Sequence, residues 1–361
     1  MKKNNNNLIG YIGTYTGNEG KGIYVYNINF ENGKFELIDV YTEIDNPSYL
    51  TINSEKNRLY AVSELTEFQG EKTGLVASFS IADKTGKLKF LNKKITGGGA
   101  PCYLSLDQNN EYLFVSNYVG GSIAVFPLTQ EGEIKNSVFF RQHSGSSVNS
   151  SRQKNPHPHS IRTDPTNNYV VVPDLGIDKL MIYKINKSRQ GQLLNKSSEA
   201  KIAPGAGPRH IVFHPDQDYA YLINELDSSI SVLKYQNQGK MEEIQKVSCL
   251  PAEFNGSNTS ADIHVHPSGN FLYGSNRGHD SIVIYKIDKS SGKLTYLNHE
   301  STRGQVPRNF VLDPSGEFLL AANQETNSLT LFNINQKTGE LSFTGTQIKV
   351  PEPVCIKLLS R

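Results

Sequence analysis

Several features that would mark other protein classes are scarce in this chain of 361 residues. It has no tryptophan, three methionines and three cysteines. The cysteines, Cys102, Cys249 and Cys355, are odd in number and far apart, which fits neither a disulfide framework nor a zinc site and favours a reducing compartment. No run of about eighteen apolar residues occurs, and no apolar segment follows the lysines and asparagines of residues 1–7. We therefore expect a cytoplasmic protein with no membrane partner and a flexible tail over residues 1–7.

A strong charge of one sign is missing as well. The 37 lysines and arginines nearly balance the 35 aspartates and glutamates, for a net charge of +2. A protein that binds phosphate backbones would be far more basic, so we expect no nucleic-acid partner and only local recognition of charge.

Motifs for cofactors and covalent catalysis are absent too. The sequence has no P-loop, no convincing Rossmann glycine pattern, no HExxH and no GxSxG, so we expect no cofactor and no serine nucleophile. His264 and His266 alternate along one segment, and His157 lies two residues before His159, but no carboxylate stands at a diagnostic spacing. We expect no metal site.

Turn formers and β-formers are plentiful, with 30 glycines, 16 prolines, 18 tyrosines and 16 phenylalanines, and they fall into repeats. One segment type reads as two alternating strands, usually around a glycine turn, and has copies from Gly22, Leu75, Ser122, Lys179, Ser229, Ser281 and Ser328. A second type precedes each copy, from Ile9, Arg58, Tyr112, Tyr169, Tyr219, Phe271 and Phe318. A third type precedes the second, from Ser48, Cys102, His159, Arg209, Ala261 and Arg308, and its seventh copy, from Val354, ends the chain. The spacing is about 52 residues per repeat, which is typical of propeller blades.

The displaced seventh copy predicts how the fold closes. If each repeat is a four-stranded antiparallel blade, the last strand must complete the blade that the amino terminus begins, which leaves no open edge. The sequence thus predicts an all-β fold: a seven-bladed β-propeller formed by residues 8–361 as one domain and closed by its carboxy-terminal strand. A β-sandwich would not produce three registers of seven.

Strand directions also predict where a site lies. The start of each innermost strand and the loop after the second strand emerge at the same end of the ring, where loops on a rigid scaffold concentrate function. Polar residues at these positions are His157, His159, Arg209, His210, Asp262, Arg308, Asn309, Glu64, Asn117, Tyr118, Asp174, Glu225, Asn276, Arg277, His279 and Gln324.

The chemistry of these residues suits an anionic substrate. Arg209, Arg277 and Arg308 offer guanidinium groups for a carboxylate or phosphate. His159 and Glu225 offer proton acceptors, and the nearby positive charges should lower both pKa values, which keeps Glu225 ionised and His159 neutral. The long polar stretch over residues 143–159 is typical of a lid or a disordered segment.

The stretches SGSSVNSSRQKNPHPHS, VPDLGIDKLMIYKI, GPRHIVFHP, YLINELDSSI and SNRGHDSI together resemble the seven-bladed propeller lactonase family. That family includes bacterial propeller-type 6-phosphogluconolactonases and, more distantly, fungal carboxy-cis,cis-muconate cyclases. The resemblance implies no required metal and a catalytic quartet at His159, Arg209, Glu225 and Arg277.

We therefore expect hydrolysis of an anionic sugar lactone, 6-phospho-D-glucono-1,5-lactone first among them, by a monomer or weak homodimer. The expected substrate-binding residues at the mouth are His157, His210, Arg308, Asn309, Asn276 and Gln324. A lactonase or muconate-type cycloisomerase acting on another carboxylate, and a propeller that only binds partners, are the alternatives.

Overall fold

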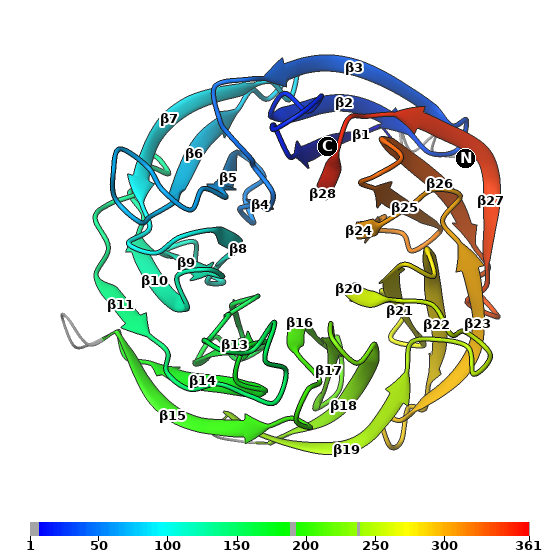
Figure 1. Cartoon of the computed structure of the whole chain (residues 1–361). Helices are drawn as coiled ribbons and strands as arrows, with labels where there is room; N and C mark the ends of the chain where they lie inside the picture. Colours follow the sequence, from blue (N-terminus) through cyan, green and yellow to red (C-terminus); the bar gives the residue numbers. More distant parts are fainter. Residues whose placement is uncertain (1–6, 188–192, 237–238, 361) are drawn as a thin grey trace.

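The computed structural model describes residues 7–187, 193–236 and 239–360, which form twenty-eight strands in seven four-stranded antiparallel sheets arranged as a ring (Figure 1). The predicted seven-bladed propeller is therefore confirmed. Residues 1–6 of the expected tail lie outside the described residues, and the first strand already begins at Asn7.

Each blade contributes one strand to each of four concentric positions. The innermost strands are β28 (Pro353–Ser360), β4 (Leu50–Ile52), β8 (Pro101–Leu106), β12 (Arg162–Thr163), β16 (Pro208–Phe213), β20 (Thr259–Val265) and β24 (Pro307–Leu312). The second strands are β1 (Asn7–Thr14), β5 (Arg58–Ser63), β9 (Tyr112–Asn117), β13 (Tyr169–Asp174), β17 (Tyr219–Asn224), β21 (Phe271–Arg277) and β25 (Phe318–Asn323). The third strands are β2 (Ile23–Asn29), β6 (Leu75–Ile81), β10 (Ser122–Pro127), β14 (Lys179–Ile185), β18 (Ser229–Gln236), β22 (Ser281–Ile287) and β26 (Ser328–Ile334). The outermost strands are β3 (Lys34–Tyr41), β7 (Leu88–Ile95), β11 (Phe139–Gln142), β15 (Leu194–Lys201), β19 (Lys240–Ser248), β23 (Leu294–Ser301) and β27 (Leu341–Lys349).

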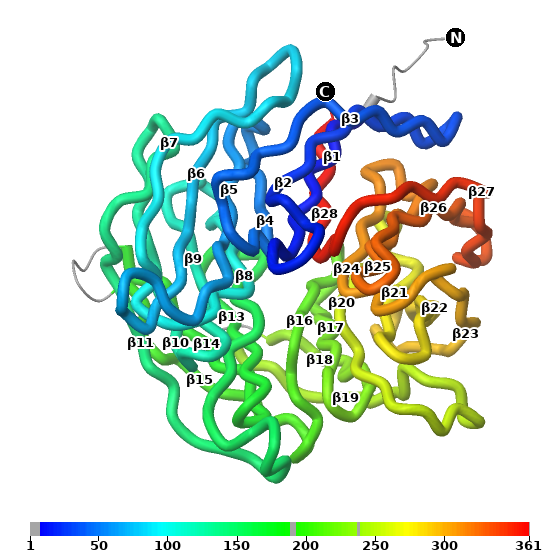
Figure 2. Tube along the Cα trace, turned by 45° about the horizontal axis from the view of Figure 1, so that its top comes forward, coloured from blue at the N-terminus to red at the C-terminus, as the bar shows by residue number. Residues whose placement is uncertain are grey.

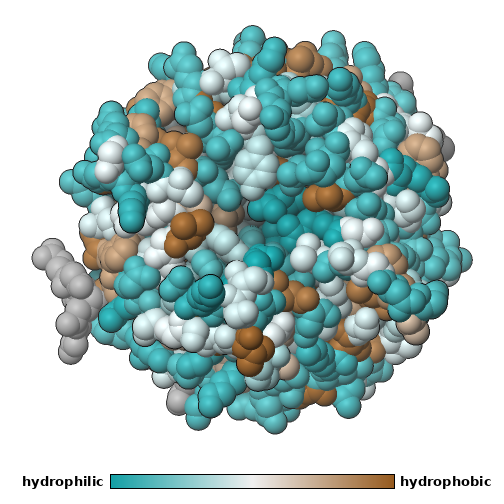
Figure 3. Space-filling view, viewed as in Figure 1, coloured by the Kyte–Doolittle hydropathy of each residue, from teal (hydrophilic) through white to brown (hydrophobic). Residues whose placement is uncertain are grey.

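The apolar core lies between the blades rather than inside any one of them. Second and third strands are buried on both faces because each blade packs against two neighbours. The outermost strands carry mostly half-buried and exposed residues. One cluster joins Tyr221 of β17 to Leu272 and Tyr285 of the next blade. Hydrophilic residues gather instead at the centre of the ring (Figure 3).

Hydrogen bonds between neighbouring blades repeat with the fold. Tyr11, Tyr221 and Tyr273 on second strands each donate a hydroxyl hydrogen bond, of 2.8, 3.0 and 2.8 Å, to a glycine carbonyl in the outer hairpin of the next blade. At the last of these turns Gly339 has a φ of 75°, and a Cβ there would lie 2.4 Å from the Phe271 ring. Glycine in these hairpins therefore serves both the turn and the contact between blades.

The ring closes as the sequence predicts. β28 pairs antiparallel with β1, with Ile356 opposite Ile12, and the two strands lie side by side although they come from opposite ends of the chain (Figure 2). Within the described part of the chain, no helix is long and apolar enough to cross a membrane.

One innermost strand is much shorter than the sequence suggests. β12 consists of Arg162–Thr163 alone, so His159 precedes it. His159 is still held beside β13, because its N–H donates to the Pro173 carbonyl at 3.0 Å and Pro158 forms an isolated bridge with Asp174.

Candidate active site

The four residues of the expected quartet meet at one end of the ring, called the upper end here. His159 precedes β12, Arg209 is the second residue of β16, Glu225 follows β17, and Arg277 ends β21. The innermost strand of a blade starts at this end, and its antiparallel neighbour finishes there. Residues from three adjacent blades therefore share one site.

Glu225 lies at the centre of this site. Its Oε2 atom is 2.9 Å from Arg209 Nε, 3.0 Å from an Arg277 nitrogen and 3.7 Å from His159 Nε2. Its other oxygen, Oε1, is 2.6 Å from a nitrogen of Arg152. We call these five residues the Glu225 cluster.

Backbone contacts hold the cluster in place. Arg209, 2% exposed, also donates to the Ala261 carbonyl. Arg277 donates to the carbonyls of Thr259 and Ser260 at 3.3 and 3.1 Å. These groups are fixed before any ligand arrives, which is the arrangement that electrostatic catalysis requires.

Burial and charge together set the protonation of the cluster. Burial acts to raise the pKa of Glu225, but the charges of Arg277, Arg209 and Arg152 outweigh it and hold that pKa well below the usual range. Burial, with the charge of Arg209 next in size, lowers the pKa of His159 well below its usual value. Burial also lowers the pKa of Arg277 to about 10. At neutral pH the cluster thus holds an ionised carboxylate, charged arginines and a neutral imidazole, as the sequence leads one to expect.

Arg308 adds a fourth guanidinium group at the upper end. It lies 5.5 Å from the ring centre of Tyr15, whose hydroxyl donates to Glu64 at 3.2 Å. Burial raises the pKa of Tyr15, so the hydroxyl stays protonated. Arg308 makes no ion pair with a carboxylate of the described residues. Four guanidinium groups therefore stand against the carboxylates of Glu225, Glu64 and Asp262, which leaves an excess of positive charge.

Sequence reasoning misses Arg152. It lies in the stretch 143–159, where one nitrogen donates to Glu225 at 2.6 Å and to the Tyr118 hydroxyl at 3.0 Å. The only sequence signal was the length and polarity of that stretch, because an irregular segment has no periodicity that aims a side chain.

His157 lies beside the cluster without joining it. Its imidazole stacks on Tyr118 at 4.6 Å, and its Nδ1 is 2.8 Å from the Tyr118 carbonyl oxygen. Tyr118 meets the edge of His159 at 5.2 Å. His157 therefore supports the wall of the site.

Three other residues expected to bind substrate make their contacts elsewhere. The buried amide of Asn276 is used by Ser260 and Ser281 of its own blade and by Cys249 and Asn258 in the connection from the preceding blade. The buried amide of Asn309 ties β24 to β20 and β28. Gln324, on the rim, has its side-chain hydrogen bond with Glu325 at 3.4 Å. Among the described residues, no side-chain hydrogen bond joins any of the three to the Glu225 cluster.

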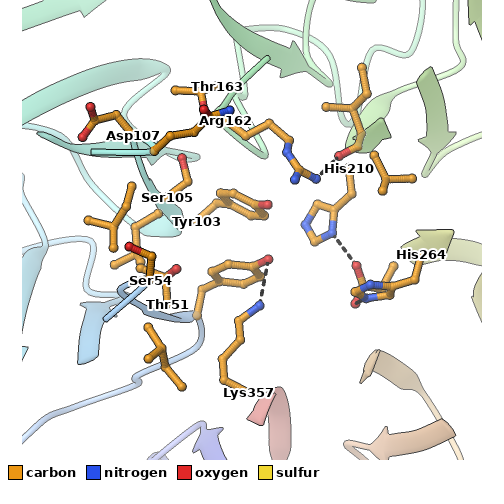
Figure 4. A pocket seen from close by; sticks show the side chains of 18 of the residues that line it. Thr51, Ser54, Tyr103, Ser105, Asp107, Arg162, Thr163, His210, His264 and Lys357 are labelled. Atoms are coloured by element: carbon orange, nitrogen blue, oxygen red, sulfur yellow. Dashed lines mark hydrogen bonds and ion pairs between the residues drawn. The ribbon is translucent and has the colours of Figure 1, made fainter. Parts of the chain in front are cut away.

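His210 lies between the Glu225 cluster and a cavity beneath it. A hollow of about 460 Å³ lies toward the carboxyl ends of the innermost strands, and its lining includes Tyr103, Lys357 and His210 (Figure 4). The His210 ring is 5.3 Å from the His159 ring, and its Nδ1 is 2.9 Å from Asp262. Burial and the charge of Arg209 lower the pKa of His210 to about 3. His210 thus lies between the Glu225 cluster and this lower cavity, with its Nε2 3.3 Å from a nitrogen of Arg209.

Cys102 contacts the cluster but has no nucleophilic character. Its Sγ lies 3.8 Å from His159 Nδ1 and 3.4 Å from the His159 carbonyl oxygen. Burial raises its pKa to about 12, so it remains a thiol at neutral pH. Across the residues that the structure describes, no three His, Cys, Asp or Glu side chains converge as metal ligands.

Comparison with known proteins covers almost the whole chain. The family model described as lactonase, 7-bladed beta-propeller, matches residues 9–358. The chain is 38% identical to the 6-phosphogluconolactonase of Bacillus subtilis over 352 residues, which cover 97% of this chain and 98% of that protein. It is 37% identical to the 6-phosphogluconolactonase of Formosa agariphila, over 84% of this chain and 86% of that one. Among solved structures, the periplasmic gluconolactonase of Pseudomonas aeruginosa superposes with a TM-score of 0.93 at 30% identity, over 98% of this chain and 99% of that one.

Proposed function

Because the chain belongs to the seven-bladed β-propeller lactonase family, we propose that it hydrolyses a sugar lactone at the Glu225 cluster. The substrate class follows from two relatives named 6-phosphogluconolactonase and a structural neighbour titled gluconolactonase. The excess positive charge at the upper end favours the phosphorylated compound, 6-phospho-D-glucono-1,5-lactone, whose product is 6-phosphogluconate, an intermediate of the pentose phosphate pathway. The one observation that carries the proposal is a neutral imidazole beside fixed guanidinium groups in a single buried site.

His159 is the better candidate for the general base. The oxygens of Glu225 already accept hydrogen bonds from arginines, and its lowered pKa makes it a weak proton acceptor. His159 Nε2 is 3.7 Å from Glu225, longer than a hydrogen bond, so it remains available to a water molecule. In this assignment the carboxylate of Glu225 stabilises, by its charge, the imidazolium that forms.

The reaction then proceeds by addition and elimination at the lactone carbonyl. Water attacks the carbonyl carbon while His159 takes its proton, and the carbonyl oxygen becomes an oxyanion that Arg209 and Arg277 stabilise. The C–O bond to the ring oxygen then breaks, the imidazolium returns the proton to that oxygen, and the open-chain acid is released. A well-placed donor to such an oxyanion is worth about 3 to 4 kcal/mol.

Substrate charge helps the base. Besides burial, nearby positive charges act to lower the pKa of His159, and Arg209 and Arg308 are among them. An anionic substrate bound at these arginines offsets that charge and raises the pKa of His159, which makes the imidazole a stronger base when substrate is present.

The test compares hydrolysis of 6-phosphogluconolactone with the spontaneous reaction, at a pH where the latter is slow. The purified protein should accelerate it, and His159→Ala and Arg209→Ala should each lose at least tenfold in kcat/KM while retaining the native far-UV circular dichroism. His299→Gln, on the outermost strand β23, is the matched histidine control and should keep full activity. A folded wild-type protein no faster than buffer would refute the proposal.

We also propose that the protein works in the cytoplasm as a monomer or weak homodimer, without a nucleic-acid or membrane partner. All three cysteines are free and buried, in agreement with a reducing compartment. Sedimentation analysis over a range of concentrations should find mainly the 40.1 kDa species. A stable larger assembly would contradict the monomer or weak dimer.

A further inference from the structure

Arg152 differs from the other arginines of the cluster in what it leaves open. Its side chain is 38% exposed, against 2% for Arg209 and 11% for Arg277. Only one of its guanidinium nitrogens is engaged, with Glu225 and the Tyr118 hydroxyl, and the other two make no hydrogen bond within the described residues. Arg152 therefore presents unused donors at the solvent side of the site.

The segment that carries Arg152 is fixed on the ring. The Asn149 side chain accepts the backbone N–H groups of Ser151 and Arg152, both at 3.1 Å. Gln153, fully buried, donates to the Leu175 carbonyl at 2.8 Å and accepts the Asn149 N–H at 3.0 Å. The guanidinium of Arg152 is thus positioned rather than left to sample solvent.

The Glu225 carboxylate also fixes the spacing between Arg152, at the solvent side of the site, and the inner arginine Arg277. Arg152 donates to Oε1 at 2.6 Å and Arg277 donates to Oε2 at 3.0 Å. Since both donors contact the same carboxylate, they are no farther apart than the two ends of a hexose. A sugar lactone whose carbonyl lies against the inner arginines can therefore place its far end beside Arg152.

From these contacts we infer that Arg152 binds the phosphate group of the substrate and sets the preference for a phosphorylated over an unphosphorylated lactone. The inference rests on the proposed function. Guanidinium nitrogens in a planar fork match phosphate oxygens, and a half-exposed position suits a group that is costly to remove from water. Arg308 is half-buried like Arg152, but it packs on Tyr15 in the first blade and makes no ion pair with Glu225. Arg152 is the guanidinium that combines exposure with direct contact to Glu225.

The experiment measures kcat/KM for 6-phosphogluconolactone and for D-glucono-1,5-lactone in the wild type, Arg152→Gln and Arg152→Lys. We expect the ratio of the two values to fall about 10- to 100-fold in Arg152→Gln, mainly through KM for the phosphorylated lactone, as for loss of a hydrogen bond to a charged group. Arg152→Lys keeps the charge without the fork and should recover part of the ratio. Lys154→Gln removes an exposed positive charge two residues away and should leave the ratio unchanged.

Inorganic phosphate gives a second readout. It should inhibit hydrolysis of the unphosphorylated lactone competitively in the wild type and at least tenfold more weakly in Arg152→Gln. Equal losses on both lactones, with unchanged phosphate inhibition, would show that Arg152 acts only through Glu225 and would overturn the inference while leaving the lactonase intact. A wild type that accelerates neither lactone would overturn the proposed function itself and, with it, the inference.

Discussion

Replacing Glu225 by glutamine keeps the shape of the side chain and removes the one negative charge among three guanidinium groups. Among the arginines, Arg209 loses the most electrostatic stabilisation, because its side chain is 2% exposed and its Nε is 2.9 Å from the carboxylate. Removing one member of a buried ion pair costs about 3–5 kcal/mol, since the remaining charge stays buried without a partner. That is a large part of the roughly 5–15 kcal/mol by which domains are stable. Arg277 and Arg152 are more exposed, so the loss of their ion pairs should add less to the destabilisation.

Urea unfolding followed by far-UV circular dichroism measures this loss, and the absence of tryptophan rules out intrinsic tryptophan fluorescence. Glu199→Gln is the matched control, because Glu199 also pairs with two cations, Lys179 and Lys196, both at 2.8 Å, but is 28% exposed. Its loss should cost about 1 kcal/mol or less. Inorganic phosphate should stabilise Glu225→Gln more than the wild type, because an anion can take the place of the carboxylate. If Glu225→Gln costs no more than Glu199→Gln, the reasoning about buried charge is wrong.

Three further outcomes follow from the same contacts. Ile356→Ala, in the closing strand β28, should lower the free energy of unfolding by about 2–5 kcal/mol because the side chain is 1% exposed; a loss below about 1 kcal/mol in urea titrations would argue against a closed ring. The folded-state pKa of His210, lowered from 6.5 to about 3, means that only the unfolded chain takes up this proton between those values, so stability falls as the pH drops through that window. His210→Asn should flatten the dependence of unfolding free energy on pH between pH 4 and 6 by about 1.4 kcal/mol per pH unit, and an unchanged slope would place the titration elsewhere. Cys102→Ser should keep lactonase activity, because the thiol pKa of about 12 precludes a thiolate nucleophile; a tenfold fall in kcat in the lactone assay would reveal a role for the sulfur.

The architecture could be predicted from the sequence because each blade is built from local signals. Strand alternation and glycine turns are properties of short segments, and seven copies of each make the register unambiguous. The displaced copy from Val354 then dictated the closure with β1. Strand direction alone was enough to predict that four residues lie at the same end of the ring: His159, Arg209, Glu225 and Arg277.

Side-chain direction was harder to predict. His210 and Arg209 are neighbours on β16, and successive residues of a strand normally point to opposite sides. A register shift between Pro208 and His210 interrupts this alternation, so strand position alone does not predict where His210 points. Asn276 and Asn309 occupy the expected positions, but their amides satisfy strands and turns around them, a demand that sequence position does not reveal. Arg152 lies in an irregular segment, whose path depends on contacts made after the blades assemble.

Ring closure also serves the site itself. Arg308 belongs to β24 in the last blade, and its aromatic partner Tyr15 directly follows β1 in the first. Between them runs β28, which Asn309, next to Arg308, binds through the Ile356 N–H at 2.7 Å. A weakened seam would therefore let Arg308 move away from Tyr15 while the Glu225 cluster, built on blades four to six, stayed intact. The position of Arg308 thus depends on the closure, whereas His159 and Glu225 belong to blades on the far side of the ring.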